Sequence, residues 1–144
     1  MKVHFAGHIS FQKPLELAGV NYILDTFYEI KHLKLEKRIE HLKIMNKKKH
    51  SIVDSGLFTM MFGAKKGTPI SEQFIIDWQN DYADTINMAG YKHSIVECDV
   101  QKILSPEFAW EMRRKFKTQV KVPIINVYHL EDKSPDKLIE YSDY

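Results

Sequence analysis

The sequence predicts an α/β fold with about five parallel strands. Two observations support this: five short runs rich in β-branched or aromatic residues, and intervening segments whose apolar residues recur every three or four positions. Strands that alternate with helices pair in parallel through right-handed crossovers. The pattern therefore fits either a doubly wound sheet or a (β/α)₈ barrel, and five units are too few to close such a barrel.

The five predicted strands are short, and each is followed by a turn or by the start of a helix. They cover residues 2–6, 22–26, 51–53, 94–98 and 122–128. The last residues, 138–144, have the pattern of a helix end that runs toward another strand. We therefore expect residues 1–144 to form one domain or part of one.

Three amphipathic helices are predicted between the strands, because three intervening segments carry an apolar stripe. The stripe residues are Leu35, Ile39 and Leu42; Phe74, Trp78, Tyr82 and Ile86; and Phe108, Met112 and Phe116. Capping residues agree with this interpretation, since Ser71 precedes the second helix and Ser105 with Pro106 precedes the third. Ser134 and Pro135 repeat the same pattern near the end of the chain.

The composition is that of one ordinary soluble domain, with 44% hydrophobic and 28% charged residues among 144. No apolar run approaches the ~20 residues of a transmembrane helix, and the N-terminus lacks the apolar core of a signal peptide, so we expect a cytoplasmic protein without a membrane partner. The single cysteine, Cys98, excludes an internal disulfide and a cysteine-based zinc site. His4 and His8 have no acidic or thiol companions at metal-binding spacing. No metal and no cofactor is predicted.

Basic residues are concentrated in residues 31–49, although the net charge is only +2. We expect this segment to form a helix with a cationic face, which is most often solvated surface and less often a phosphate contact. Lys65 and Lys66 lie between glycines in a loop and are better placed to contact a nucleic-acid backbone. Arg38, Glu111 and Arg113 are expected to be surface charges on helices.

A candidate site follows the third predicted strand. Asp54 comes directly after that strand, where the carboxyl ends of parallel strands gather ligands. Gly56 allows a sharp turn, and Phe58 offers a flat aromatic face. The same three residue types, Asp, Ser and Gly, are also common in ordinary turns, so a purely structural turn is the alternative.

The order of these features resembles the tRNA-guanine transglycosylase superfamily, within it the phage and bacterial branch that inserts 7-deazaguanine bases into DNA. The matching segments are V-H-F-A-G-H at 3–8, G-V-N-Y-I-L at 19–24, D-S-G-L-F-T at 54–59, V-E-C-D at 96–99 and P-I-I-N-V-Y-H at 123–129. Leu57 is larger than the residue usual at its place, and Thr59 replaces the customary Gln or Ser. The family's nucleophilic Asp and the zinc site of its tRNA branch lie later than this chain extends.

The resemblance implies a (β/α) half-barrel that replaces guanine in DNA, or in tRNA, by a 7-deazaguanine base through a glycosyl-enzyme intermediate. Asp54 would transfer protons, while Ser55, Phe58, Asp99 and His129 would bind the base. The nucleophile would then come from a second polypeptide that completes the barrel, or from a second copy of the chain.

Simpler interpretations stand beside these roles. Phe58 can be a core residue, Asp99 can cap a turn, and His129 can be a hydrogen-bonding residue at a strand end. For the whole chain, one alternative is a catalytically inactive subunit that binds a nucleobase or nucleic acid or serves a regulatory role. Another is a flavodoxin-like domain of unrelated function, which predicts a stable monomer with no exposed apolar flank.

Overall fold

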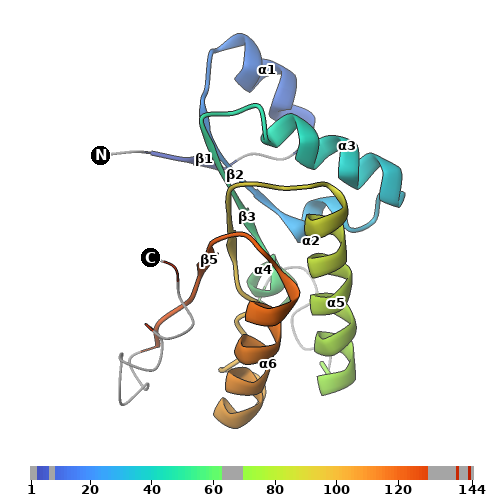
Figure 1. Cartoon of the computed structure of the whole chain (residues 1–144), viewed down its shortest axis with the longest axis vertical. Helices are drawn as coiled ribbons and strands as arrows, with labels where there is room; N and C mark the ends of the chain where they lie inside the picture. Colours follow the sequence, from blue (N-terminus) through green and yellow to red (C-terminus); the bar gives the residue numbers. More distant parts are fainter. Residues whose placement is uncertain (1–2, 7–8, 63–69, 130–138, 140–142, 144) are drawn as a thin grey trace.

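The protein forms a five-stranded, all-parallel sheet whose strands lie side by side in sequence order, β1-β2-β3-β4-β5 (Figure 1). The computed structural model describes residues 3–6, 9–62, 70–129, 139 and 143. The strands are β1 (Phe5–Ala6), β2 (Tyr22–Thr26), β3 (His50–Asp54), β4 (Ser94–Val96) and β5 (Ile124–Ile125). The predicted α/β fold with five parallel strands is confirmed. The predicted bounds of β2 are those observed, β3 is one residue longer at each end than predicted, and β1, β4 and β5 are shorter than predicted.

The three predicted amphipathic helices are also present. They are α3 (Leu35–Met45), α5 (Glu72–Met88) and α6 (Pro106–Gln119). The hydroxyl oxygens of Ser71 and Ser105 accept hydrogen bonds from the backbone N–H groups of Phe74 and Phe108, so both predicted caps are confirmed. The third predicted cap, at residues 134–135, lies outside the described residues.

Four shorter helical segments complete the described elements. They are the 3₁₀ helix η1 (Ile9–Phe11), α1 (Gln12–Leu17), α2 (Phe27–Ile30) and α4 (Leu57–Phe62). The start of α2 is set by Thr26, whose hydroxyl oxygen accepts from the backbone N–H of Glu29 at 3.3 Å. Because α4 begins three residues after Asp54, the chain turns from β3 directly into a helix beside the candidate site.

The two faces of the sheet are buried to different extents. One face presents Val53 between its register partners Asp25 and Ile95, and all three side chains are buried beneath the helices. On the opposite face, Leu24 and Ile52 are only half-buried. Sequential strands joined by right-handed crossovers place their helices on one face, and α5 accordingly packs against both α3 and α6. This is the arrangement of consecutive units in a (β/α) barrel and differs from a doubly wound sheet, whose strand order reverses.

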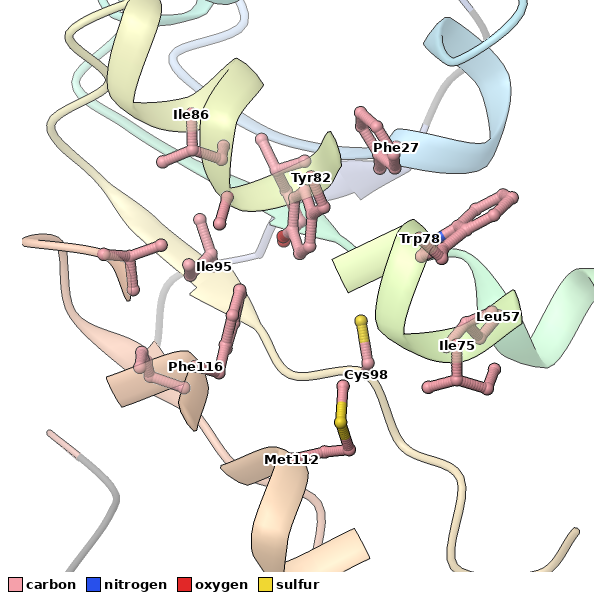
Figure 2. Close-up of a cluster of buried hydrophobic side chains, with 14 of the residues drawn as sticks. Phe27, Leu57, Ile75, Trp78, Tyr82, Ile86, Ile95, Cys98, Met112 and Phe116 are labelled. Atoms are coloured by element: carbon pink, nitrogen blue, oxygen red, sulfur yellow. The ribbon is translucent and has the colours of Figure 1, made fainter. Parts of the chain in front are cut away.

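The hydrophobic core lies between α5, α6 and the helix-facing side of the sheet (Figure 2). Tyr82 stands at its centre, with ring centroids 5.0 Å from Phe27 and 5.5 Å from Phe116. The Tyr82 hydroxyl donates a 2.7 Å hydrogen bond to the carbonyl oxygen of Val53. The core therefore fixes α5 to β3 one residue before the candidate catalytic Asp54.

The edge of β5 that faces away from β4 is contacted by a residue from the end of the chain. The backbone N–H of Asp143 donates to the carbonyl oxygen of Ile124, and its Oδ2 atom accepts from the backbone N–H of Ile124 at 2.9 Å. Lys117 holds the other carboxylate oxygen at 2.6 Å. Asp143 thus occupies the position at which a sixth strand would begin to pair with β5.

The expectation of surface charge is wrong for Arg113, which is buried, because α6 turns it toward the end of β4. Arg38 is half-buried and binds both carboxylate oxygens of Asp81 on α5. Glu111 is exposed, as expected. Within the described residues, no helix combines the length and apolar character needed to cross a bilayer.

Candidate site at the carboxyl ends of the strands

Asp54 is the last residue of β3, and its side chain lies on the half-buried face of the sheet because strand residues alternate and Val53 faces the helices. The backbone N–H of Gly56 donates a 2.6 Å hydrogen bond to its Oδ1 atom. Gly56 has a φ of 72°, a conformation that favours glycine. Residues 54–56 therefore do form a turn, and this turn fixes the position of the Asp54 carboxyl group.

The protonation equilibrium of Asp54 is displaced from that of an ordinary aspartate. Burial raises the pKa of the carboxyl group, the hydrogen bond from Gly56 lowers it, and the negative charge of Asp99 raises it again, with a net increase. Asp54 therefore keeps its proton to a higher pH than an exposed aspartate does. A carboxyl group whose pKa is raised in this way is suited to donate a proton and to take one back.

Asp99 and His129 are paired at the carboxyl ends of the strands, and the charge of Asp99 acts on Asp54. Asp99 follows β4, His129 follows β5, and the Nε2 atom of His129 lies 2.7 Å from Oδ1 of Asp99. The Asp99 carboxylate remains partly exposed, with 24% of its side chain accessible, whereas His129 is buried. The structure thus brings two of the sequence-predicted site residues into contact, and the charge of Asp99 acts on the third, Asp54. The contact also agrees with the simpler interpretation of His129 as a strand-end hydrogen-bonding residue.

Ser55, the residue after Asp54, is buried on the helix-facing side of the turn. Its carbonyl oxygen accepts a 3.2 Å hydrogen bond from Nε1 of Trp78, and its hydroxyl interacts with the thiol of Cys98. Its contacts therefore fix the turn to α5 and to the end of β4. They give Ser55 a supporting role rather than a place on the same face as Asp54.

Phe58 is exposed on α4, so its interpretation as a core residue is wrong. Its side chain is 69% accessible, and its ring centroid lies 4.8 Å from that of Phe62, which is 46% accessible. The core position in this motif is taken by the preceding residue, Leu57, which is fully buried. This packing gives a physical reason for the large residue at position 57 and leaves an exposed aromatic pair on α4, the helix that begins three residues after Asp54.

A buried network that sequence reasoning missed lies next to the site. Glu97, directly after β4, forms two hydrogen bonds with Arg113 of α6 at 2.7 and 3.0 Å. Two signals for it were present. An acid interrupts the apolar run at 94–98, and Arg113 lies three residues before Phe116, next to the apolar stripe of α6.

The described residues place neither a metal centre nor the predicted lysine contacts in the site. Among the described residues, no group of three His, Cys, Asp or Glu side chains could hold a metal ion. His4 instead pairs with His50 near the amino ends of the strands, with 2.9 Å between Nε2 and Nδ1. Lys65 and Lys66 lie outside the described residues.

Comparison of the chain with models of known protein families, with curated proteins and with solved structures found no match.

Proposed function

We propose that this chain supplies the proton-transferring carboxyl group and the base pocket of a nucleic-acid base-exchange site, in which guanine in DNA is replaced by a 7-deazaguanine base. The observation that carries the proposal is the half-buried Asp54 with a raised pKa at the carboxyl end of β3, beside the paired Asp99 and His129. The resemblance of the 54–59 segment to the transglycosylase motif supports the same assignment.

The chemistry requires one nucleophile and one group that moves protons. In the first step a carboxylate oxygen forms a bond to C1′ of the nucleotide while the bond from C1′ to guanine N9 breaks, and Asp54 donates its proton to the leaving base. In the second step Asp54 removes a proton from the incoming base, whose nitrogen displaces the carboxylate from C1′. A raised pKa suits Asp54 to both transfers.

The remaining residues suit a purine-like base. Such a base is held by an aromatic stack and by acceptors for its amino and imino N–H groups, because unpaired donors in a pocket are costly. Phe58 offers an exposed ring, and Asp99 offers a partly exposed carboxylate whose position is fixed by His129. Because Phe58 and Asp99 would bind the base, Asp54 would remain available for proton transfer.

A partner that completes the barrel is part of the proposal. Parallel sheets are usually covered on both faces, yet Leu24, Ile52, Val96 and Ile125 on the face opposite the helices remain half-buried. A second polypeptide, or a second copy of this chain, would cover this face and bring the nucleophilic carboxylate to the strand ends. DNA is the favoured nucleic-acid substrate and tRNA the alternative.

Two measurements test the proposal. The first is calorimetric binding of guanine and a 7-deazaguanine base to the chain, in which Asp99→Asn should weaken binding at least about tenfold and the exposed Glu111→Gln should not. The second is exchange of labelled guanine in DNA by the chain co-expressed with candidate partner proteins. Asp54→Asn should abolish exchange and retain base binding. Absence of base binding by the unmodified chain would reject the proposal.

A catalytically inactive base-binding or regulatory subunit is the second candidate. It is favoured by the state of the other acids near the described strand ends, since Asp25, Glu97 and Asp99 are each engaged by a histidine or an arginine. A carboxylate held in this way is a poor nucleophile. Base binding without exchange in the presence of every candidate partner would select this function.

A further inference from the structure

A buried network of charged and amide groups joins the ends of β4 and β5. The carboxylate of Glu97 accepts four hydrogen bonds: two from Arg113, one from the side-chain nitrogen of Asn126 and one from the backbone N–H of Val127, the last two at 2.7 Å. The Nη2 atom of Arg113 also donates to the carbonyl oxygen of Val127 at 3.0 Å. Both backbone polar groups of Val127 are therefore held by one ion pair.

A contribution to the stability of the fold does not by itself explain why this buried network is present. Glu97 is 2% and Arg113 is 4% accessible, and a buried ion pair of this kind is often no more stabilising than a well-packed apolar pair. Two of its atoms, Nη1 of Arg113 and Oδ1 of Asn126, are buried without a hydrogen-bond partner, which adds a further cost. What the network provides, and an apolar pair would not, is a fixed geometry.

That geometry leads directly to the candidate site. The carbonyl oxygen of Glu97 accepts from the backbone N–H of Asp99 at 3.1 Å, so the network fixes the start of the segment that carries Asp99. Val127, which Glu97 and Arg113 hold, lies two residues before His129, so the network also fixes the start of the segment that carries His129. The 2.7 Å contact between Asp99 and His129 then joins the segment after β4 to the segment after β5.

We propose that Glu97 and Arg113 are positioning residues, which hold His129 against Asp99 and thereby keep the Asp99 carboxylate beside Asp54. The positioning of His129 and Asp99 by Glu97 and Arg113 does not depend on the reaction that the site performs. Its consequence for base binding and exchange rests on the proposed function.

The test is the state of the His129 ring in Glu97→Gln and Arg113→Lys, which remove the charge or the bidentate geometry with little change in volume. Proton NMR of the unmodified chain should show a downfield ring N–H signal of His129, assigned by its loss in His129→Gln. Both network variants should lose this signal. The Asp54 carboxyl, observed by carbon NMR, should also titrate at a lower pH once the Asp99 charge has moved away.

A matched control separates positioning from a general loss of stability. Asp25 on β2 and His41 on α3 form another buried pair at 2.7 Å, between elements that do not carry Asp99 or His129. Asp25→Asn should destabilise the fold and leave both NMR signals unchanged. Folded Glu97→Gln and Arg113→Lys proteins that keep the His129 signal and the Asp54 titration would overturn the inference.

Loss of folding in the single variants is avoided by removing both charges together. Glu97→Met with Arg113→Leu leaves no unpaired buried charge, so this protein should fold and lose the His129 signal. Asn126→Ala, which removes one hydrogen bond of the network, should weaken the same signal, and retention of the signal in both proteins would reject positioning. If the NMR changes occur but the unmodified chain binds no base, the proposed function fails while the positioning role stands.

Discussion

Gly56 lies directly against the backbone of Tyr28. A Cβ atom added to Gly56 would overlap the Cβ of Tyr28 and lie 2.9 Å from its backbone nitrogen. The turn that presents Asp54 is therefore packed against the first turn of α2, and two connections that follow neighbouring strands support each other. This contact explains why glycine is required at position 56 in addition to its φ of 72°.

Gly56→Ala should destabilise the protein by roughly 2–4 kcal/mol, because a left-handed conformation and an unavoidable overlap with backbone atoms act together. Urea denaturation followed by circular dichroism measures the change. Gly90→Ala is the matched control, since Gly90 has a φ of 57° and open space around it. That substitution should cost only about 1 kcal/mol, and equal losses in the two variants would show that the contact with Tyr28 is unimportant.

The raised pKa of Asp54 predicts a particular pH dependence of stability. The folded state disfavours the ionised carboxylate, so the contribution of Asp54 to stability is fully present below the pKa of the unfolded chain and is lost as pH rises through the folded pKa. Asn at this position stays neutral. The free energy of unfolding of the unmodified protein, relative to that of Asp54→Asn, should therefore fall as pH rises above 3.8, the ordinary pKa of an aspartate.

Asp143 provides a control of opposite sign. The hydrogen bond from Lys117 lowers the pKa of the Asp143 carboxyl group, burial raises it by a smaller amount, and the hydrogen bond from the backbone N–H of Ile124 lowers it again, with a net decrease. Its contribution is present above the unfolded pKa and is lost as pH falls through the folded pKa. Relative to Asp143→Asn, the unmodified protein should gain stability as pH rises through the acid range. The same slope for both pairs would contradict these assignments.

The fold could be predicted because its main elements carry a clear period. The apolar stripes of α3, α5 and α6 are long enough to show a repeat, and the strands alternate with them. Helices α1, α2 and α4 span six, four and six residues, which is too short for a stripe to be recognised. For α2 a signal existed, since Thr26 and Glu29 have the spacing of a capping box.

The candidate site could be predicted only where position along the chain determines position in space. Asp54 ends β3 and Asp99 follows β4, and these are neighbouring strands of one parallel sheet, so the electrostatic interaction between the two residues follows from the fold. The pairing of Glu97 with Arg113 depends on how α6 crosses β4, which no local pattern specifies. The exposure of Phe58 likewise depends on which residue of α4, here Leu57, enters the core.

Cys98 should be unreactive in the folded protein. Burial raises the pKa of its thiol well above the ordinary value, and the nearby charges of Glu97 and Asp54 raise it further against a hydrogen bond from Ser55. Because the thiolate is the reactive form, labelling with a disulfide reagent at pH 8 should be at least about 100-fold slower in buffer than in denaturant. Met88→Cys, at an exposed site on α5, should add one rapidly reacting thiol. Rapid labelling of Cys98 in buffer would indicate that the core between α5 and α6 opens readily.

The hydroxyl group of Tyr82 should contribute to stability through its 2.7 Å hydrogen bond to the carbonyl oxygen of Val53. Tyr82→Phe keeps the ring contacts with Phe27 and Phe116 but deprives a buried carbonyl group of its donor, so we expect a loss of about 1–2 kcal/mol in urea denaturation. Tyr28→Phe removes the same hydroxyl from a half-buried ring stacked on Trp78 and should cost less than about 0.5 kcal/mol. If both variants are as stable as the unmodified protein, the attachment of α5 to the end of β3 depends on apolar packing alone.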